Sequence, residues 1–198
     1  MIWAEHIKEL NSILNGLSVN RSDGSAVGIE DAFLLWKETA LLIRKQKKTV
    51  FLIGNGASAS MASHISADLA KNAHVRAEVF SDLSLITAIA NDLNYEEVFA
   101  EPLRRRMIPG DMLVAVSSSG QSPNVIKAAR EAVNLGGIVV TLSAMGPDNA
   151  LRLLGDINFY VPAETYGAAE TCQAAILHFW VDQIVYESLE TPTHNKEN

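Results

Sequence analysis

The sequence predicts an α/β protein, a three-layer sandwich in which helices cover both faces of a five-stranded parallel sheet. The first observation is a series of short apolar runs, each with the length of a strand that is buried on both faces. The second is their spacing, because enough chain separates successive runs for a crossover helix. The predicted strands span residues 49–53, 75–80, 112–117, 137–142 and 157–161.

The segments outside these runs predict helices. Residues 30–47 carry apolar side chains three and four positions apart, which is the pattern of an amphipathic helix. These side chains are Phe33, Trp36, Ala40 and Ile43. The Gly-, Ser- and Asp-rich run 20–28 should separate this helix from an earlier one. Residues 168–189 contain no Pro or Gly and predict a long C-terminal helix.

The length of 198 residues allows one sizeable core and argues against a second full domain. We therefore expect an N-terminal helical arm at residues 1–48 and one α/β domain at residues 49–190. The polar sequence at residues 191–198 predicts a disordered tail.

Composition narrows the classes of partner and location. The net charge of −7 repels phosphate backbones, so we expect no nucleic-acid partner. No run approaches the roughly 18 apolar residues that span a bilayer, and the first residues lack the pattern of a secretory signal, so we expect no membrane partner and a cytoplasmic protein. The single cysteine, Cys172, excludes a disulfide framework and a multi-cysteine zinc site. Ligands of any bound metal should be mainly His and carboxylate.

Two loops that follow predicted strands have the chemistry of an anion site. Residues 54–58 are small and let backbone N–H groups approach a ligand just before a helix begins. Residues 117–122 carry four Ser hydroxyls, and Ser122 and Pro123 suit the N-cap and the first position of a helix. Ligands of parallel sheets bind at the carboxyl ends of strands, so these loops predict a phosphate site made of neutral donors.

Two other interpretations of these loops stay open. The Ser-rich loop is also typical of a simple helix cap. Residues 54–59 match the dinucleotide pattern G-x-G-x-x-A, and Glu78 lies where a ribose-binding acid is expected. A dinucleotide fold gives no reason for a second hydroxyl-rich loop, so the pair of loops favours a phosphosugar.

Four segments in the same order resemble signature blocks of phosphoheptose isomerases, a branch of the sugar isomerase domain (SIS) family. They are FLIGNGASASMASHISADL, LITAIANDLNYEEVF, VSSSGQSPNVIKAA and ETCQAAILHFWVDQI, which cover most of residues 50–185. The resemblance implies a flavodoxin-like fold, a homotetramer with active sites shared between subunits, and one Zn²⁺ per site.

The resemblance also implies roles for individual residues. Asp68 and His178 would be catalytic, with Asp68 as base and His178 as acid. His64, Asp68, Glu170 and His178 would be the metal positions. Substrate and phosphate contacts would come from Asn55, Gly56, Ser58, Asn91, Asp92, Ser117, Ser118, Ser119 and Ser122. The family usually has Glu at the position of Asp68 and Gln at that of Glu170.

Spacing along the helices supports part of this set. His64 and Asp68 are four residues apart and share one helix face, as ligation of one metal or an ion pair requires. Glu170 and His178 are eight residues apart, a rise of about 12 Å along a straight helix. Either Glu170 reaches along the axis or a ligand comes from a neighbouring subunit. Without the resemblance, His64 also fits a hydrogen-bonded surface histidine and Asp68 a solvated charge near Lys71.

We therefore predict an enzyme, an aldose-ketose isomerase that converts sedoheptulose 7-phosphate to D-glycero-D-manno-heptose 7-phosphate through an enediol. Such a reaction needs a base and a proton donor, and a metal would polarise the carbonyl. The sequence leaves two alternatives open. One is a non-catalytic tetrameric adaptor of the kind that associates with a replication initiator, and the other is an isomerase or sensor for another sugar phosphate.

Overall fold

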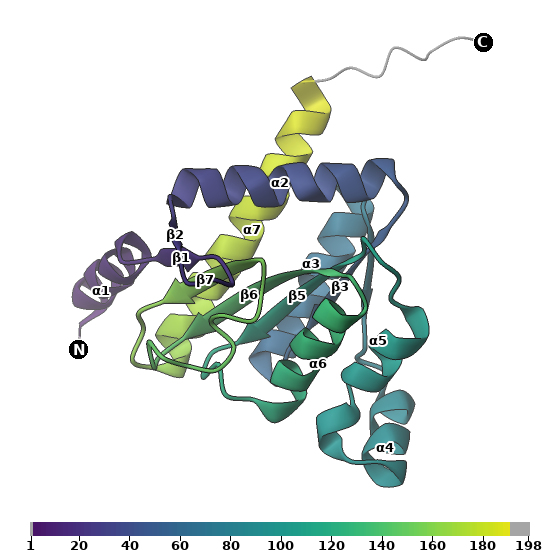
Figure 1. Cartoon of the computed structure of the whole chain (residues 1–198). Helices are drawn as coiled ribbons and strands as arrows, with labels where there is room; N and C mark the ends of the chain where they lie inside the picture. Colours follow the sequence, from purple (N-terminus) through teal and green to yellow (C-terminus); the bar gives the residue numbers. More distant parts are fainter. Residues whose placement is uncertain (1, 191–198) are drawn as a thin grey trace.

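The computed structural model describes residues 2–190 as a seven-stranded sheet with helices on both faces (Figure 1). The strands are β1 Ser18–Asn20, β2 Ala26–Val27, β3 Thr49–Ile53, β4 Arg76–Val79, β5 Met112–Ser117, β6 Ile138–Ala144 and β7 Ile157–Val161. The helices are α1 Trp3–Asn15, α2 Ile29–Lys45, α3 Ala57–Lys71, α4 Leu83–Asp92, the 3-10 helix η1 Tyr95–Glu97, α5 Ala100–Arg106, α6 Pro123–Asn134 and α7 Tyr166–Glu190. The predicted tail, residues 191–198, lies outside the described residues.

The five predicted strands form the parallel part of the sheet, in the order β7-β6-β5-β3-β4. From β3 the chain moves outward to β4, then returns to the other side of β3 as β5 and continues to β6 and β7. This reversal makes the boundary between β3 and β5 the topological switch point, where α/β proteins bind ligands. The loops at 54–58 and 117–122 both leave the sheet at this point.

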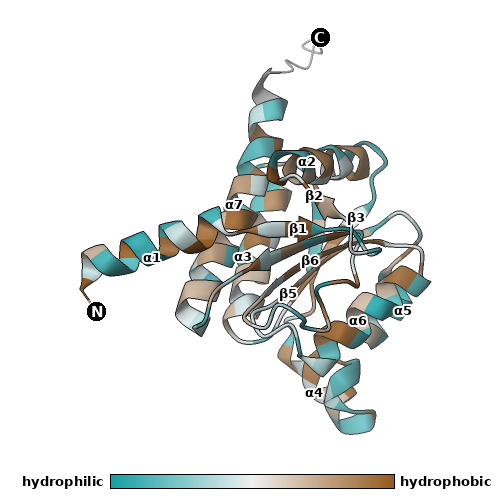
Figure 2. Cartoon of the chain, turned by 60° about the vertical axis from the view of Figure 1, so that its left-hand side comes forward, coloured by the Kyte–Doolittle hydropathy of each residue, from teal (hydrophilic) through white to brown (hydrophobic). Residues whose placement is uncertain are grey.

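Alternate side chains of the sheet enter two separate cores, which makes three layers. Val50 and Leu52 pack in one core with α2, α3 and α7, whereas Phe51 and Ile53 pack in the other with α5 and α6. Because both faces are covered, the central strands β5 and β6 are mostly apolar (Figure 2). The predicted three-layer sandwich is confirmed.

The N-terminal region differs from the prediction, because the sheet has two further strands. The run 20–28 does separate two helices, but it does so as the turn of a hairpin. The turn places Gly24 at φ +83, and the backbone N–H of Arg21 donates to the carbonyl of Ser25. β1 pairs antiparallel with both β2 and β7, so it extends the sheet at that edge. Strands of three and two residues are too short to show the alternation that predicts strands.

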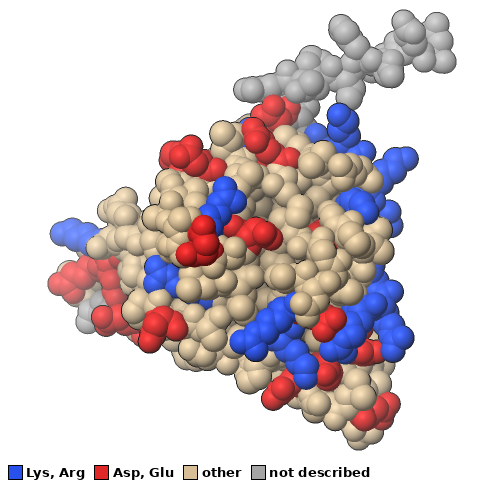
Figure 3. All heavy atoms as spheres, viewed as in Figure 1, with Lys and Arg blue, Asp and Glu red and all other residues tan. Residues whose placement is uncertain are grey.

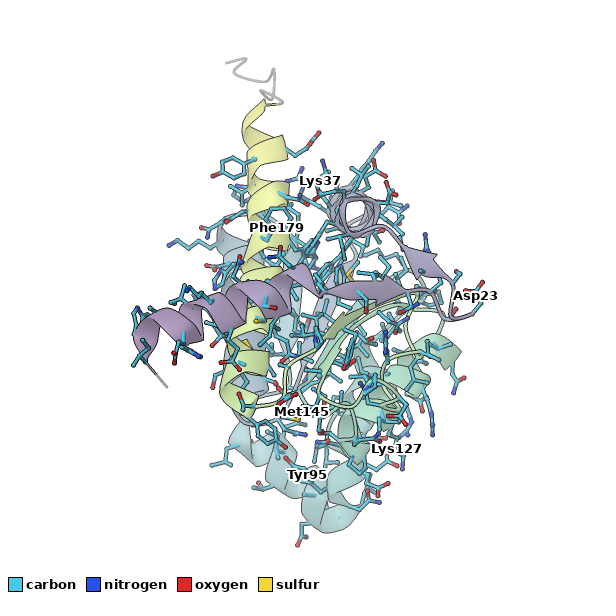
Figure 4. The ribbon with its side chains drawn as sticks, turned by 90° about the vertical axis from the view of Figure 1, so that its left-hand side faces the viewer. Asp23, Lys37, Tyr95, Lys127, Met145 and Phe179 are labelled. Atoms are coloured by element: carbon cyan, nitrogen blue, oxygen red, sulfur yellow. The ribbon has the colours of Figure 1, made fainter. Side chains whose placement is uncertain are left out.

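Charged residues fix η1 to α5 and α6. Arg104 pairs with Glu97 at 3.0 Å, with Glu101 at 2.8 Å and with Glu131 at 3.2 Å. Lys127 pairs with Glu97 at 2.8 Å, and this hydrogen bond is the main reason that the pKa of Glu97 lies below its usual range. Basic and acidic groups are correspondingly intermixed in this region of the surface, at the lower right of Figure 3. The network holds Tyr95, the first residue of η1, near the switch point (Figure 4).

Candidate active site

The loop after β3 needs glycine at two positions. A Cβ atom on Gly54 would lie 2.6 Å from Cβ of Ser58, so a side chain there would prevent the first turn of α3 from packing against the end of β3. Gly56 precedes α3 with φ +55 and ψ −123, a conformation that is open essentially only to glycine. The backbone therefore turns sharply and presents the start of α3 toward the switch point.

The loop after β5 begins α6 as predicted, with Ser122 at the N-cap and Pro123 at the first helical position. The Ser122 side chain, however, makes no hydrogen bond to the backbone of the first turn. Its hydroxyl lies 3.2 Å from the Ser117 hydroxyl. The side chain therefore contributes to the hydroxyl cluster, which a simple helix cap does not require.

The two loops line one cavity of about 280 Å³. Asn55, Gly56 and Ser58 line it from the first loop and α3, and Ser117, Ser118, Ser119 and Ser122 line it from the second. Two helix N-termini, those of α3 and α6, open at this cavity, and each carries a partial positive charge. The cavity can therefore hold an anion although the chain is acidic overall.

The hydroxyl groups of the second loop differ in what they can donate. Ser118 donates its hydroxyl hydrogen to Oε1 of the buried Gln173 at 3.1 Å. Ser119 accepts the backbone N–H of Gln121 at 3.2 Å, and within residues 2–190 its own hydrogen is uncommitted. Ser117 and Ser122 share one hydrogen bond, so one of their two hydrogens is uncommitted. The donors available to a ligand are thus concentrated on Ser117, Ser119 and Ser122.

A second group of functional side chains lies on α3 and α7. His64, Asp68 and His178 each place one ligand atom within 4.8 Å of the others. Nε2 of His64 lies 3.3 Å from Oδ2 of Asp68, and the rings of His64 and His178 are 5.2 Å apart. Asn72 donates to the other oxygen of Asp68 at 3.2 Å. The Asp68 carboxylate therefore pairs with His64 and lies within 4.8 Å of a ring nitrogen of His178.

This cluster could hold a metal ion. Two imidazoles and one carboxylate are a ligand set of catalytic zinc sites, which keep the remaining position for water or substrate. The three side chains also converge from two helices, which a chance pair of surface charges on one helix does not do.

Glu170 lies at the cavity and does not join this cluster among the described residues. It lines the cavity together with Tyr166, near the start of α7, whereas His178 is two turns further along the helix. The rise of an α-helix puts residues eight apart at about 12 Å from each other along the axis. The role of Glu170 as a metal ligand stays a prediction, and one that requires Glu170 from a neighbouring subunit.

Asn91 and Asp92 are exposed at the end of α4, where Nδ2 of Asn91 donates to Oδ1 of Asp92 at 3.0 Å. They do not line the cavity between the two loops. Their predicted substrate contacts therefore remain a prediction.

His178 is exposed, although its sequence neighbours are apolar. Helical periodicity explains the difference, because Leu177 and Trp180 are buried while His178 and Phe179 lie on another face of α7. The apolar side chains of α7 are spread over nearly all sides of the helix, so the sequence alone does not identify its buried face. Exposure leaves the His178 ring accessible to a substrate or a metal.

Sequence reasoning missed four residues at the site: Tyr95, Asn124, Tyr166 and Gln173. Tyr95, Asn124 and Gln173 lie in the segments that carry the family resemblance. Gln173 also lies three residues after Glu170, the spacing of neighbours on one helix face. Asn124 and Tyr95 act on Asn55, and their sequence separations of 69 and 40 residues hide this contact.

The fold and the site together define the class of this protein. The family model of the SIS domain matches residues 25–144, and the chain belongs to this family. Among curated proteins it resembles phosphoheptose isomerase of Helicobacter pylori, with 37% identity over 142 residues, which are 68% of this chain and 73% of that protein. Phosphoheptose isomerase of Shewanella denitrificans is 33% identical over 145 residues, 69% of this chain and 74% of that protein.

Solved structures give the same result. Phosphoheptose isomerase from Neisseria gonorrhoeae superposes with a TM-score of 0.78 and 26% identity, covering 91% of this chain and 96% of that one. Within residues 2–190, no helix is long and apolar enough to cross a membrane.

Proposed function

We propose that this protein isomerises sedoheptulose 7-phosphate to D-glycero-D-manno-heptose 7-phosphate. The observation that carries the proposal is that α3 and α7 both begin at the anion cavity and both continue to the His64–Asp68–His178 cluster. This arrangement suits a substrate whose reacting carbons lie opposite its phosphate. In a heptose 7-phosphate, C1 and C2 lie at that opposite end. The identity to phosphoheptose isomerases favours this reaction over an adaptor or a sensor.

In the proposed mechanism, Ser117, Ser119, Ser122 and the N-termini of α3 and α6 hold the phosphate. Asp68 removes a proton from C1 of the ketose while His178 donates a proton to the oxygen on C2, which gives the enediol. The reaction is completed when a proton returns to C2 and the hydroxyl on C1 loses its hydrogen to form the aldehyde. Asn72 holds one oxygen of Asp68 and so fixes the orientation of the carboxylate.

We propose that His64, Asp68 and His178 hold Zn²⁺, and that Glu170 of a neighbouring subunit adds a ligand. Zn²⁺ supplies Lewis-acid polarisation of the substrate carbonyl. The structure supports this proposal through the donor set described above.

The direct test is proton exchange with solvent. When the protein is incubated with sedoheptulose 7-phosphate in deuterated water, we expect deuterium at C1 of the remaining ketose and at C2 of the aldose product, measured by NMR. A chelator should abolish the exchange and added Zn²⁺ should restore it. Absence of exchange both with and without Zn²⁺ would show that this function is wrong.

We also propose a homotetramer with active sites shared between subunits. α1 extends away from the rest of the chain (Figures 1 and 4) and exposes apolar side chains, among them Trp3 at 75% and Ile7 at 45%. Such a helix in a soluble protein normally packs against a partner.

We propose that the enzyme acts in the cytoplasm, because the phosphate charge keeps a substrate of this kind from crossing a bilayer unaided.

The assembly can be tested by light scattering coupled to size-exclusion chromatography. We expect a mass four times that of the chain for the wild type and a smaller mass for the double variant Trp3→Glu, Ile7→Glu. Lys8→Glu on the same helix serves as the control and should leave the mass unchanged. A wild-type protein that is monomeric at micromolar concentration contradicts the proposal.

A further inference from the structure

Asn124 forms a closed pair of hydrogen bonds with Asn55 across the switch point. Nδ2 of Asn124 donates to Oδ1 of Asn55 at 2.9 Å, and Nδ2 of Asn55 donates to Oδ1 of Asn124 at 2.9 Å. Asn55 follows β3, and Asn124 lies in the first turn of α6, after β5. Asn124 is 2% exposed, and it does not line the cavity itself. It therefore reaches a ligand only through Asn55.

The surroundings fix which atom of each amide is the oxygen. The backbone N–H of Val125 lies 3.0 Å from Oδ1 of Asn124, and because an N–H group can only donate, that atom must accept. Nδ2 of Asn124 then faces Asn55, whose Oδ1 also accepts the hydroxyl of Tyr95 at 3.3 Å. Asn55 Oδ1 is thus supplied with two donors.

One donor on Asn55 remains. Its Nδ2 carries two hydrogens and gives one of them to Asn124. The other is uncommitted among the described residues, and Asn55 lines the cavity that holds the Ser117, Ser119 and Ser122 hydroxyls. If the Asn55 amide were reversed, its oxygen would take the place of this donor and would repel the oxygen atoms of a phosphosugar.

We propose that Asn124 is a positioning residue, which locks the Asn55 amide so that it presents an N–H donor to the phosphosugar. The identity of this ligand rests on the proposed function. The lock also joins the two loops of the site, whose residues are 69 positions apart in the sequence. Asn124 thereby sets the substrate affinity without touching the substrate.

A double-mutant cycle with Asn55→Ala and Asn124→Ala tests this role. Because the loss of a hydrogen bond to the phosphosugar weakens binding of substrate and transition state alike, each single variant should raise KM for sedoheptulose 7-phosphate about tenfold and change kcat less than about threefold. If Asn124 acts through Asn55, adding Asn124→Ala to the Asn55→Ala variant should change KM by less than about twofold.

Asn158→Ala is the matched control. Asn158 is a fully buried asparagine in β7 that bonds Thr141 and the backbone of Gly155, away from the cavity. We expect it to lower the melting temperature and to leave KM unchanged. If Asn124→Ala behaves in the same way, or if the two single variants multiply their effects on KM, Asn124 is only structural and the inference is wrong.

The same double-mutant cycle can be measured with inorganic phosphate, using calorimetry to obtain its dissociation constant. This measurement separates the inference from the proposed function. A wild type that binds phosphate but exchanges no substrate proton would refute the isomerase proposal, and the phosphate cycle would then decide the role of Asn124. A wild type that binds neither phosphate nor the sugar phosphate overturns both.

Discussion

Replacing Asp68 with Asn should lower kcat for the isomerisation by about 100- to 10,000-fold, the usual contribution of a positioned general base. The amide has nearly the size of the carboxylate and can still accept from Asn72 through its oxygen. It cannot accept a proton from C1, and it is a weaker partner for His64, which lies 3.3 Å from Oδ2 of Asp68. The loss should therefore appear mainly in kcat.

The measurement is the rate of aldose formation at saturating substrate, together with the metal content of the purified variant. Asp23→Asn is the control, because Asp23 lies in the turn between β1 and β2, where it accepts the backbone N–H of Ser25. It should retain wild-type kcat. An Asp68→Asn variant that keeps more than about a tenth of the wild-type kcat would exclude Asp68 as the base.

Strands β3, β5, β6 and β7 were predictable because each is buried on both faces. Phe51 and Leu52 enter opposite cores, and a continuous apolar run is the direct consequence of that environment. The hairpin of β1 and β2 was not predictable, since its pairing with β7 joins Val19 to Phe159 across most of the chain. The sequence near either strand shows no pattern that indicates such a contact.

The site was predictable to the extent that topology determines it. Once β3 and β5 are neighbouring parallel strands, the loops with Asn55 and Ser117 must leave the same edge of the sheet. The partners that orient these residues were not predictable. Gln173 orients Ser118 and Asn124 orients Asn55, and both contacts depend on how α6 and α7 pack.

The position of α7, which carries both Glu170 and His178, depends on a stacked pair of tryptophans. The rings of Trp36 on α2 and Trp180 on α7 lie 4.1 Å apart with an angle of 9° between their planes. Both side chains are fully buried, and Phe159 of β7 contacts the Trp36 ring at 5.2 Å. The pair therefore joins two helices to the sheet at one place.

Trp180→Ala should lower the free energy of unfolding by about 3–5 kcal/mol, the usual cost of removing a large buried aromatic side chain. The loss has two parts: folding buries less apolar surface, and a cavity is left beside Trp36. Denaturant titration followed by circular dichroism measures it. Tyr186→Ala, at an exposed position of the same helix, should cost less than about 1 kcal/mol.

The variant Trp180→Phe tests whether ring stacking on Trp36, and not only the volume of the Trp180 side chain, stabilises the protein. Nε1 of Trp180 is buried and has no hydrogen-bond partner among the described residues, so the wild type already bears the desolvation cost of that N–H group. Phe removes this group and keeps an aromatic face against Trp36, and it should therefore retain most of the stability that Ala loses. If Phe and Ala destabilise the protein equally, the ring contact with Trp36 is not what holds α7 against α2.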